Sequence, residues 1–170
     1  MSVLKIPRKI LDDMVAHALE LDPFECCGIL AGKEGLVCRL YRIKNVVSLD
    51  GAENLSSFDQ AKIDHLKRLS PQERAKIAFT MDMDDLSRAQ KDIRANGLEL
   101  QVVYHSHPHS SALPSITDIK IASDYEEIWP KINLAVPAYL IISLEEKSKP
   151  DIRAYRIKDR QVFPTEFQLI

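Results

Sequence analysis

The chain has 170 residues, of which 45% are hydrophobic and 28% are charged, and its formal net charge is −2. These values are typical of one globular domain and give no sign of a nucleic-acid or membrane partner. No run approaches the ~18 apolar residues of a membrane helix, and the first residues lack the apolar core of a signal peptide. The chain has three cysteines, two of them adjacent, which do not form a disulfide framework. We therefore expect a cytoplasmic protein, because a reducing compartment suits unpaired thiols.

The first predicted helix covers residues 7–20. Its apolar residues repeat at helical spacing and form a single stripe, made of Ile10, Leu11, Met14, Val15, Ala18 and Leu19. Pro7 suits the first turn of a helix. His17 lies on the polar side of the stripe, so we expect it at the surface.

A buried strand is predicted at residues 25–31, followed by a turn and a second strand at 36–46. Glu25 stands at the start of the first strand, where a carboxylate is usually only solvated. Cys26 and Cys27 come next. Cysteines in an apolar strand are usually small packing residues, although a thiol nucleophile paired with a histidine is an alternative.

Residues 48–78 have the least regular pattern. The spacing of apolar residues predicts a helix at 55–69, with His65 exposed on it. Ser70 and Glu73 have the spacing of a capping box, with a proline at the first helical position, so a short helix should run to about Ala78.

The rest of the chain alternates between strand and helix patterns. A continuous apolar run at 138–144 predicts a central strand that is buried on both faces. The other predicted elements are a short strand at 79–83, a helix capped by Asp84 that runs to about Ala95, a strand at 98–103, a hairpin strand at 152–157 and an edge strand within 162–170. This order predicts an α/β fold with a mixed sheet flanked by helices.

The residues that follow the strand at 98–103 have the pattern of a metal site. His105 and His107 are two residues apart on a strand, so their imidazoles face the same side, and Asp118 lies one turn into the helix that Ser115 opens. Three such ligands leave a fourth tetrahedral position open, as in catalytic zinc sites. Two simpler interpretations are a variant capping box of Ser115 and Asp118 and a hydrogen-bonded histidine pair on an edge strand.

The same residues resemble a family signature. His-Ser-His-Pro, six residues, Ser, two residues and Asp is similar to the motif of the JAMM/MPN (MPN+) zinc metalloproteases, and the segment Glu-Cys-Cys-Gly-Ile-Leu-Ala-Gly from Glu25 resembles one common in bacterial members. The likeness runs from Pro7 to about Ile157 and points to the compact prokaryotic type. It implies an MPN-type curved mixed β-sheet, cytidine-deaminase-like, in a single domain at 1–170 with a helical insertion at about 48–78.

The resemblance also implies a role for each residue of the motif. His105, His107 and Asp118 would hold one zinc ion per chain. Glu25 would hydrogen-bond the zinc-bound water and shuttle its proton, and Ser115 would stabilise the oxyanion. Since this set is intact, we expect a zinc metallopeptidase, a deubiquitinase-like isopeptidase that hydrolyses the amide bond after the Gly-Gly tail of a ubiquitin-like or sulfur-carrier protein.

The alternative is a non-catalytic zinc-binding MPN scaffold that recognises the same tails. In either case the extended tail is expected to add as a strand beside the site. The pattern leaves open the leaving group, a homodimer, and contact between His109 and substrate. It also leaves open whether residues 48–78 frame the substrate groove or form a peripheral hairpin.

Overall fold

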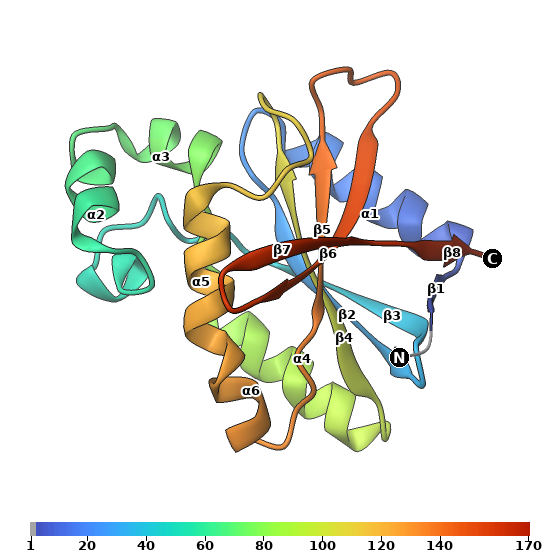
Figure 1. Cartoon of the computed structure of the whole chain (residues 1–170). Coiled ribbons are helices and arrows are strands. Elements are labelled where there is room, and N and C mark those ends of the chain that lie inside the picture. Colours follow the sequence, from blue (N-terminus) through green and yellow to red (C-terminus); the bar gives the residue numbers. More distant parts are fainter. Residues whose placement is uncertain (1–2) are drawn as a thin grey trace.

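The computed structural model describes residues 3–170, and Figure 1 shows helices placed around one curved sheet. In chain order its strands are β1 (Leu4–Ile6), β2 (Cys27–Lys33), β3 (Leu36–Ile43), β4 (Glu99–His107), β5 (Ala138–Ser143), β6 (Asp151–Lys158), β7 (Gln161–Thr165) and β8 (Phe167–Leu169). The helices are α1 (Arg8–Leu21), the 3-10 helix η1 (Ala52–Leu55), α2 (Gln60–Lys67), α3 (Pro71–Ile77), α4 (Met83–Ala95), α5 (Ile116–Glu126) and α6 (Ile128–Lys131). The expected mixed sheet flanked by helices is confirmed.

The strands form one eight-stranded sheet in the order β7-β6-β5-β4-β2-β3-β1-β8. The strand with the two histidines, β4, lies inside this sheet, antiparallel to β2 and parallel to β5. The interpretation of the histidines as an edge-strand feature is therefore wrong. An interior strand holds its side chains more rigidly than an edge strand, since both of its sides are hydrogen-bonded.

Successive residues at the start of β2 point to opposite faces of the sheet. Cys26 packs with Met14 of α1 on one face, and Cys27 packs with Ile93 of α4 on the other. Each face is thus covered by an amphipathic helix.

The prediction of a surface position for His17 is wrong. Its side chain is buried, and its Nδ1 lies 2.8 Å from the hydroxyl oxygen of Tyr104. Burial lowers the pKa of His17 to about 4, so the imidazole is neutral. The Tyr104 ring lies against Gly28, where a Cβ atom would come within 2.5 Å of it. The contact with Tyr104, which lies on β4, could not be predicted from the helical pattern, because that pattern classifies histidine only as a polar residue.

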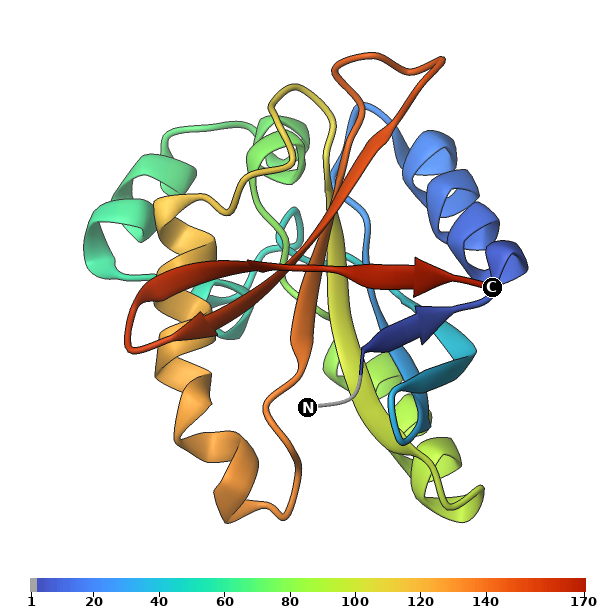
Figure 2. The same cartoon turned by 45° about the vertical axis from the view of Figure 1, so that its right-hand side comes forward.

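One continuous C-terminal stretch pairs with both ends of the sheet. β7 pairs with β6 at one end, and β8 pairs with β1 at the other, with only Glu166 between β7 and β8. Figure 2 shows this stretch in red, crossing the sheet from one side to the other. A single edge strand was expected here, and the structure has two strands at opposite ends.

Residues 48–78 fold as helices, but the first is shorter than the predicted helix at 55–69. The residues before it form η1, and α2 begins only after Asp59, whose carboxylate accepts the backbone N–H of Lys62 at 2.8 Å. The predicted capping box of α3 is confirmed. The helices pack on the small apolar cluster of Val47, Leu55, Phe58, Leu66, Ala75 and Ala78, which Ile121 of α5 also contacts.

The start of α4 also differs from the prediction. Asp82 is its N-cap instead of Asp84, and its carboxylate accepts the N–H of Asp85 at 3.0 Å. The predicted strand at 79–83 is reduced to one bridge between Asn45 and Met81. Asp82, Asp84 and Asp85 could each act as the N-cap of this helix, and spacing alone does not predict which one does.

Candidate metal centre

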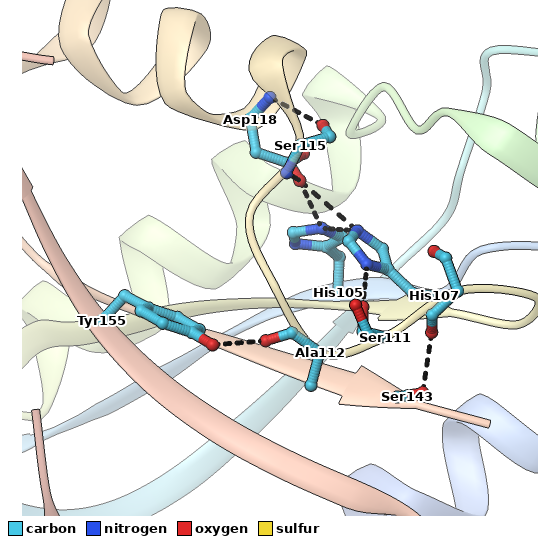
Figure 3. Close-up of polar contacts among 9 residues, drawn as sticks. His105, His107, Ser111, Ala112, Ser115, Asp118, Ser143 and Tyr155 are labelled. Carbon is cyan, nitrogen blue, oxygen red and sulfur yellow. Dashed lines mark hydrogen bonds and ion pairs between the residues drawn. The ribbon is translucent and has the colours of Figure 1, made fainter. Parts of the chain in front are cut away.

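Three side chains from β4 and α5 converge on one point (Figure 3). The Nε2 atoms of His105 and His107 are 3.0 Å apart, and Oδ2 of Asp118 lies 3.4 Å and 3.3 Å from them. A tetrahedral ion bonded at about 2.05 Å would hold its ligand atoms about 3.3 Å apart. The spacing therefore fits a metal ion, and these three residues could hold one.

The orientation of His107 is fixed by its second ring nitrogen. Nδ1 lies 2.8 Å from the carbonyl oxygen of Ser111, which can only accept, so Nδ1 carries the proton. Nε2 is then left with a free lone pair that points toward the other two ligands. This is the usual arrangement by which an outer hydrogen bond sets the tautomer of a metal-binding histidine.

The loop that contains Ser111 is held by the neighbouring strands. The hydroxyl of Ser143 in β5 donates to the Ser110 carbonyl at 2.7 Å, and the hydroxyl of Tyr155 in β6 donates to the Ala112 carbonyl at 2.6 Å. Figure 3 shows Tyr155 reaching this loop from the side. Sequence reasoning missed these supports, since their acceptors are backbone carbonyls and carry no residue signature.

Asp118 and Ser115 form the predicted capping box while Asp118 also faces the histidines. Oδ2 of Asp118 accepts the Ser115 N–H at 2.7 Å, and Oγ of Ser115 accepts the Asp118 N–H at 3.0 Å. The cap therefore fixes the carboxylate in the orientation that the site needs. Burial alone would raise the pKa of Asp118, but the His105 and His107 imidazoles outweigh it and hold the pKa well below its usual range.

The cap leaves the Ser115 hydroxyl proton free. A hydroxyl has one donor and two acceptor sites, and the Asp118 N–H occupies one acceptor site only. Ser115 is exposed at the mouth of the site. Capping and donation to a substrate are thus compatible.

Glu25 lies in the same cleft and is 6% exposed. Burial raises the pKa of its carboxyl well above the usual range; the Asp118 carboxylate raises it further, and the Lys62 ammonium opposes the shift. The cleft has a volume of about 310 Å³, and Glu25, His107, Ser115 and Asp118 all line it. A buried carboxylate beside a second one is not the solvated strand end that a glutamate usually makes there.

The comparisons with known proteins agree with this geometry. The family model described as prokaryotic homologs of the JAB domain matches residues 7–158. The chain belongs to this family.

Two curated relatives share most of their length with this JAB-family chain. The CysO-cysteine peptidase of Mycobacterium tuberculosis is 30% identical over 161 residues, which cover 94% of this chain and 86% of the relative. The probable TtuB-protein conjugate cleaving protease of Thermus thermophilus is 32% identical over 120 residues, which cover 71% of this chain and 64% of the relative. The JAB1/MPN domain protein AF2198 of Archaeoglobus fulgidus has the same fold, with a TM-score of 0.54 at 15% identity and full coverage of both chains.

Two of the three cysteines of the JAB-family chain, Cys26 and Cys27, pack in the core. Burial raises the pKa of Cys26 to about 12 and that of Cys27 well above the usual value. Both thiols are therefore protonated near neutral pH, whereas a nucleophilic cysteine needs its thiolate. This opposes the alternative of a thiol nucleophile.

None of the helices within residues 3–170 is both long enough and apolar enough to cross a bilayer.

Proposed function

We propose that this protein is a zinc metallopeptidase that hydrolyses the amide bond after the C-terminal Gly-Gly tail of a ubiquitin-like or sulfur-carrier protein. The convergence of His105, His107 and Asp118 beside a buried Glu25 carries this proposal. The named activities of the two relatives support it, since both are enzymes that cleave conjugates. The three unpaired cysteines fit the proposed reducing cytoplasm.

The ligand set favours zinc over harder cations. Two imidazoles with one carboxylate are typical donors for zinc, whereas magnesium and calcium prefer oxygen ligands alone. When bound, zinc would supply an acidified water and a Lewis acid for the scissile carbonyl.

Glu25 is the proposed general base and acid. It lies beside the ligands without belonging to the group of three, and burial raises its pKa. A carboxylate with a raised pKa takes a proton from water more readily and can return it to the leaving amine. In the balanced reaction the C–N bond breaks, the carbonyl carbon gains OH and the amine gains H.

Ser115 is the proposed donor to the oxyanion. Its hydroxyl proton is not used by the helix cap, and the side chain is exposed at the cleft. A donor that is fixed before the reaction stabilises the developing charge without a reorganisation cost. The capping box supplies that fixation.

A non-catalytic scaffold is the second candidate. It explains the ligands and the tail, but not the burial of the Glu25 carboxyl, which has no ion-pair partner within residues 3–170. Burying such a group lowers stability unless it serves a purpose. The burial of Glu25 therefore favours the enzyme.

Replacing Glu25 with glutamine separates the two functions. Glu25→Gln keeps the size of the side chain but cannot accept the proton, so zinc content and tail binding should stay near wild type while kcat falls by ~10²–10⁴-fold. The assay is release of a Gly-Gly-tailed carrier from an amide fusion, with zinc measured on the same samples. Glu99→Gln, an exposed carboxylate at the end of β4 opposite the histidines, is the matched control and should match wild type.

Two outcomes would contradict this assignment. Wild-type turnover in Glu25→Gln would remove Glu25 from the mechanism. Loss of zinc in Glu25→Gln would make the residue a ligand, and the set of three would have to be redrawn.

A further inference from the structure

Asn45, just after the end of β3, bonds to several segments of the chain through one side-chain amide. Its Nδ2 donates to the carbonyls of Glu25 at 3.0 Å and Ala78 at 3.1 Å. Its Oδ1 accepts the backbone N–H groups of Val47 at 3.1 Å and Thr80 at 3.0 Å. A side-chain amide has two donor hydrogens and two acceptor lone pairs. The whole hydrogen-bonding capacity of Asn45 is therefore used on the backbone.

The partners of the amide also fix its orientation. Carbonyl oxygens can only accept and backbone N–H groups can only donate, so the Asn45 nitrogen must face Glu25 and Ala78. The oxygen must then face the two N–H groups. Aspartate has the same shape but lacks the donor hydrogens, and it could not make the same bonds.

One of these partners is the proposed general base. Glu25 comes before β2, which begins at Cys27, so the hydrogen bonds of the sheet do not hold it. Its N–H donates to the Ala75 carbonyl of α3 at 2.7 Å, and its carbonyl accepts from Asn45. The position of the buried Glu25 side chain therefore depends on contacts outside the sheet.

Two further bonds of the amide hold a residue that touches a proposed metal ligand. They go to the Ala78 carbonyl and the Thr80 N–H, which belong to the two peptide groups on either side of Phe79. The Phe79 ring lies against the His105 imidazole, with ring centroids 4.7 Å apart and an angle of 31° between the planes. An aromatic ring at this distance restricts the rotation of the imidazole.

We propose that Asn45 is a positioning residue, which fixes the Glu25 carboxylate relative to the metal ligand His105. The inference rests on the proposed function, because a general base must lie within hydrogen-bond reach of the proton that it takes. One amide holds the backbone of Glu25 and the backbone that carries Phe79, so one side chain sets the distance between the base and the ligand. A misplacement of about 1 Å can lower a rate by about 10²-fold.

A purely structural role for Asn45 makes different predictions. Removing the amide leaves its backbone partners without this bond, which lowers the melting temperature in either case. If that were the whole effect, the folded protein would bind zinc and turn over as wild type does. Zinc affinity, and the dependence of the kcat loss on Glu25, therefore separate the two roles.

Zinc affinity is measured on metal-free protein in competition with a chelator. Residues that orient metal ligands typically contribute about 10–100-fold to affinity, so Asn45→Ala should bind zinc at least about tenfold more weakly. Phe79→Leu, which removes the flat ring, should show a similar loss. Asn54→Ala is the matched control and should bind as wild type does, because the Asn54 Nδ2 donates to the Leu49 carbonyl at 3.2 Å, away from the site. An unchanged affinity in Asn45→Ala overturns the inference.

Turnover of the Gly-Gly fusion is compared at saturating zinc, at a temperature where circular dichroism shows every variant folded. Asn45→Ala should lower kcat by about 10²-fold with little change in KM. In the Glu25→Gln background it should have almost no effect, because no base is left to misplace. Such non-additivity is typical of residues that act as a unit, and an equal loss in both backgrounds overturns the inference.

Two further provisions keep the outcome clear. Asn45→Ser keeps one hydroxyl and replaces the alanine variant if that variant does not fold, with smaller losses in the same pattern. A wild-type protein without turnover on the Gly-Gly fusion would overturn the proposed function, and the zinc measurement would still decide whether Asn45 positions His105.

Discussion

At the scale of single residues, the proposed metal centre depends on three side-chain atoms that lie close together. His107 contributes Nε2, and its Nδ1 is committed to Ser111. Because two remaining ligands hold zinc much less tightly than three, His107→Ala should lose most of its zinc. Elemental analysis of the purified protein checks this, with about one zinc per chain expected for wild type.

His109→Ala is the control for this variant. His109 is an exposed loop residue that lines the cleft outside the group of three, so the variant should keep its zinc. Equal zinc in wild type and His107→Ala would show that the ligand assignment is wrong.

The convergence of the three proposed ligands was predictable from the sequence, but their surroundings were not. The spacing of His105, His107 and Asp118 carries information because a strand and a capped helix turn fix where those side chains point. Ser143 and Tyr155 act through hydrogen bonds to backbone carbonyls of the loop between β4 and α5, and serines and tyrosines at such positions look the same as surface or core residues. Sequence patterns therefore predicted that the three side chains converge and missed the residues that hold the loop beside them.

At the scale of elements, the loop between β4 and α5 is the part on which the metal site depends. Tyr155→Phe removes the bond to the buried Ala112 carbonyl, and a buried group left unsatisfied costs about 1–3 kcal/mol. We expect a lower melting temperature and weaker zinc binding, because the same loop orients His107. Thermal unfolding and zinc titration measure the two effects.

Tyr125→Phe serves as the comparison for this prediction. Tyr125 is 40% exposed on α5, so the loss of its hydroxyl should change neither quantity. If Tyr155→Phe binds zinc as tightly as wild type, the loop does not need its anchor on β6.

Whether a segment forms a helix or a strand was predictable where one local rule applied to it. The residue at which a helix begins was not predictable where several residues could act as its N-cap. Ser70 and Glu73 form the one capping box in their segment and fixed the start of α3 correctly. At α2 and α4 the caps are Asp59 and Asp82, whereas the sequence predicted a helix from residue 55 and a cap at Asp84. The apolar residues of these helices pack with Val47 and Ile43 across the fold, and local spacing does not contain such contacts.

At the scale of the whole molecule, the stretch 161–170 closes both ends of the sheet. Phe167 packs against the main core, and Val162 packs against the cluster that contains Tyr155. Removing residues 161–170 exposes that apolar surface and leaves β6 and β1 with unpaired edges. Burying one such side chain is worth about 1.5–3 kcal/mol, so the truncated protein should lose much of its stability.

Thermal unfolding and light scattering test this prediction. The truncated chain should melt at a lower temperature and scatter more light, because open strand edges associate. Glu166→Ala, which keeps both strands, should behave like wild type. An unchanged melting temperature after truncation would mean that the closure adds nothing to stability.

The closure was not predictable from the chain alone. Residues 162–170 have a strand pattern, but the pattern does not say which strands they join. The pairing of Leu4 with Phe167 links positions far apart in the sequence, and such pairings are set by the assembled sheet.

This pairing also has a consequence for how the protein is made. The ribosome synthesises β8, the neighbour of β1 at the sheet end, more than a hundred and fifty residues after β1. At the ~5–20 residues per second of synthesis, the nascent chain spends roughly 8–30 seconds with this edge of β1 open to other strands. The interval in which this protein is most exposed to misassembly and to chaperones therefore falls during its own translation.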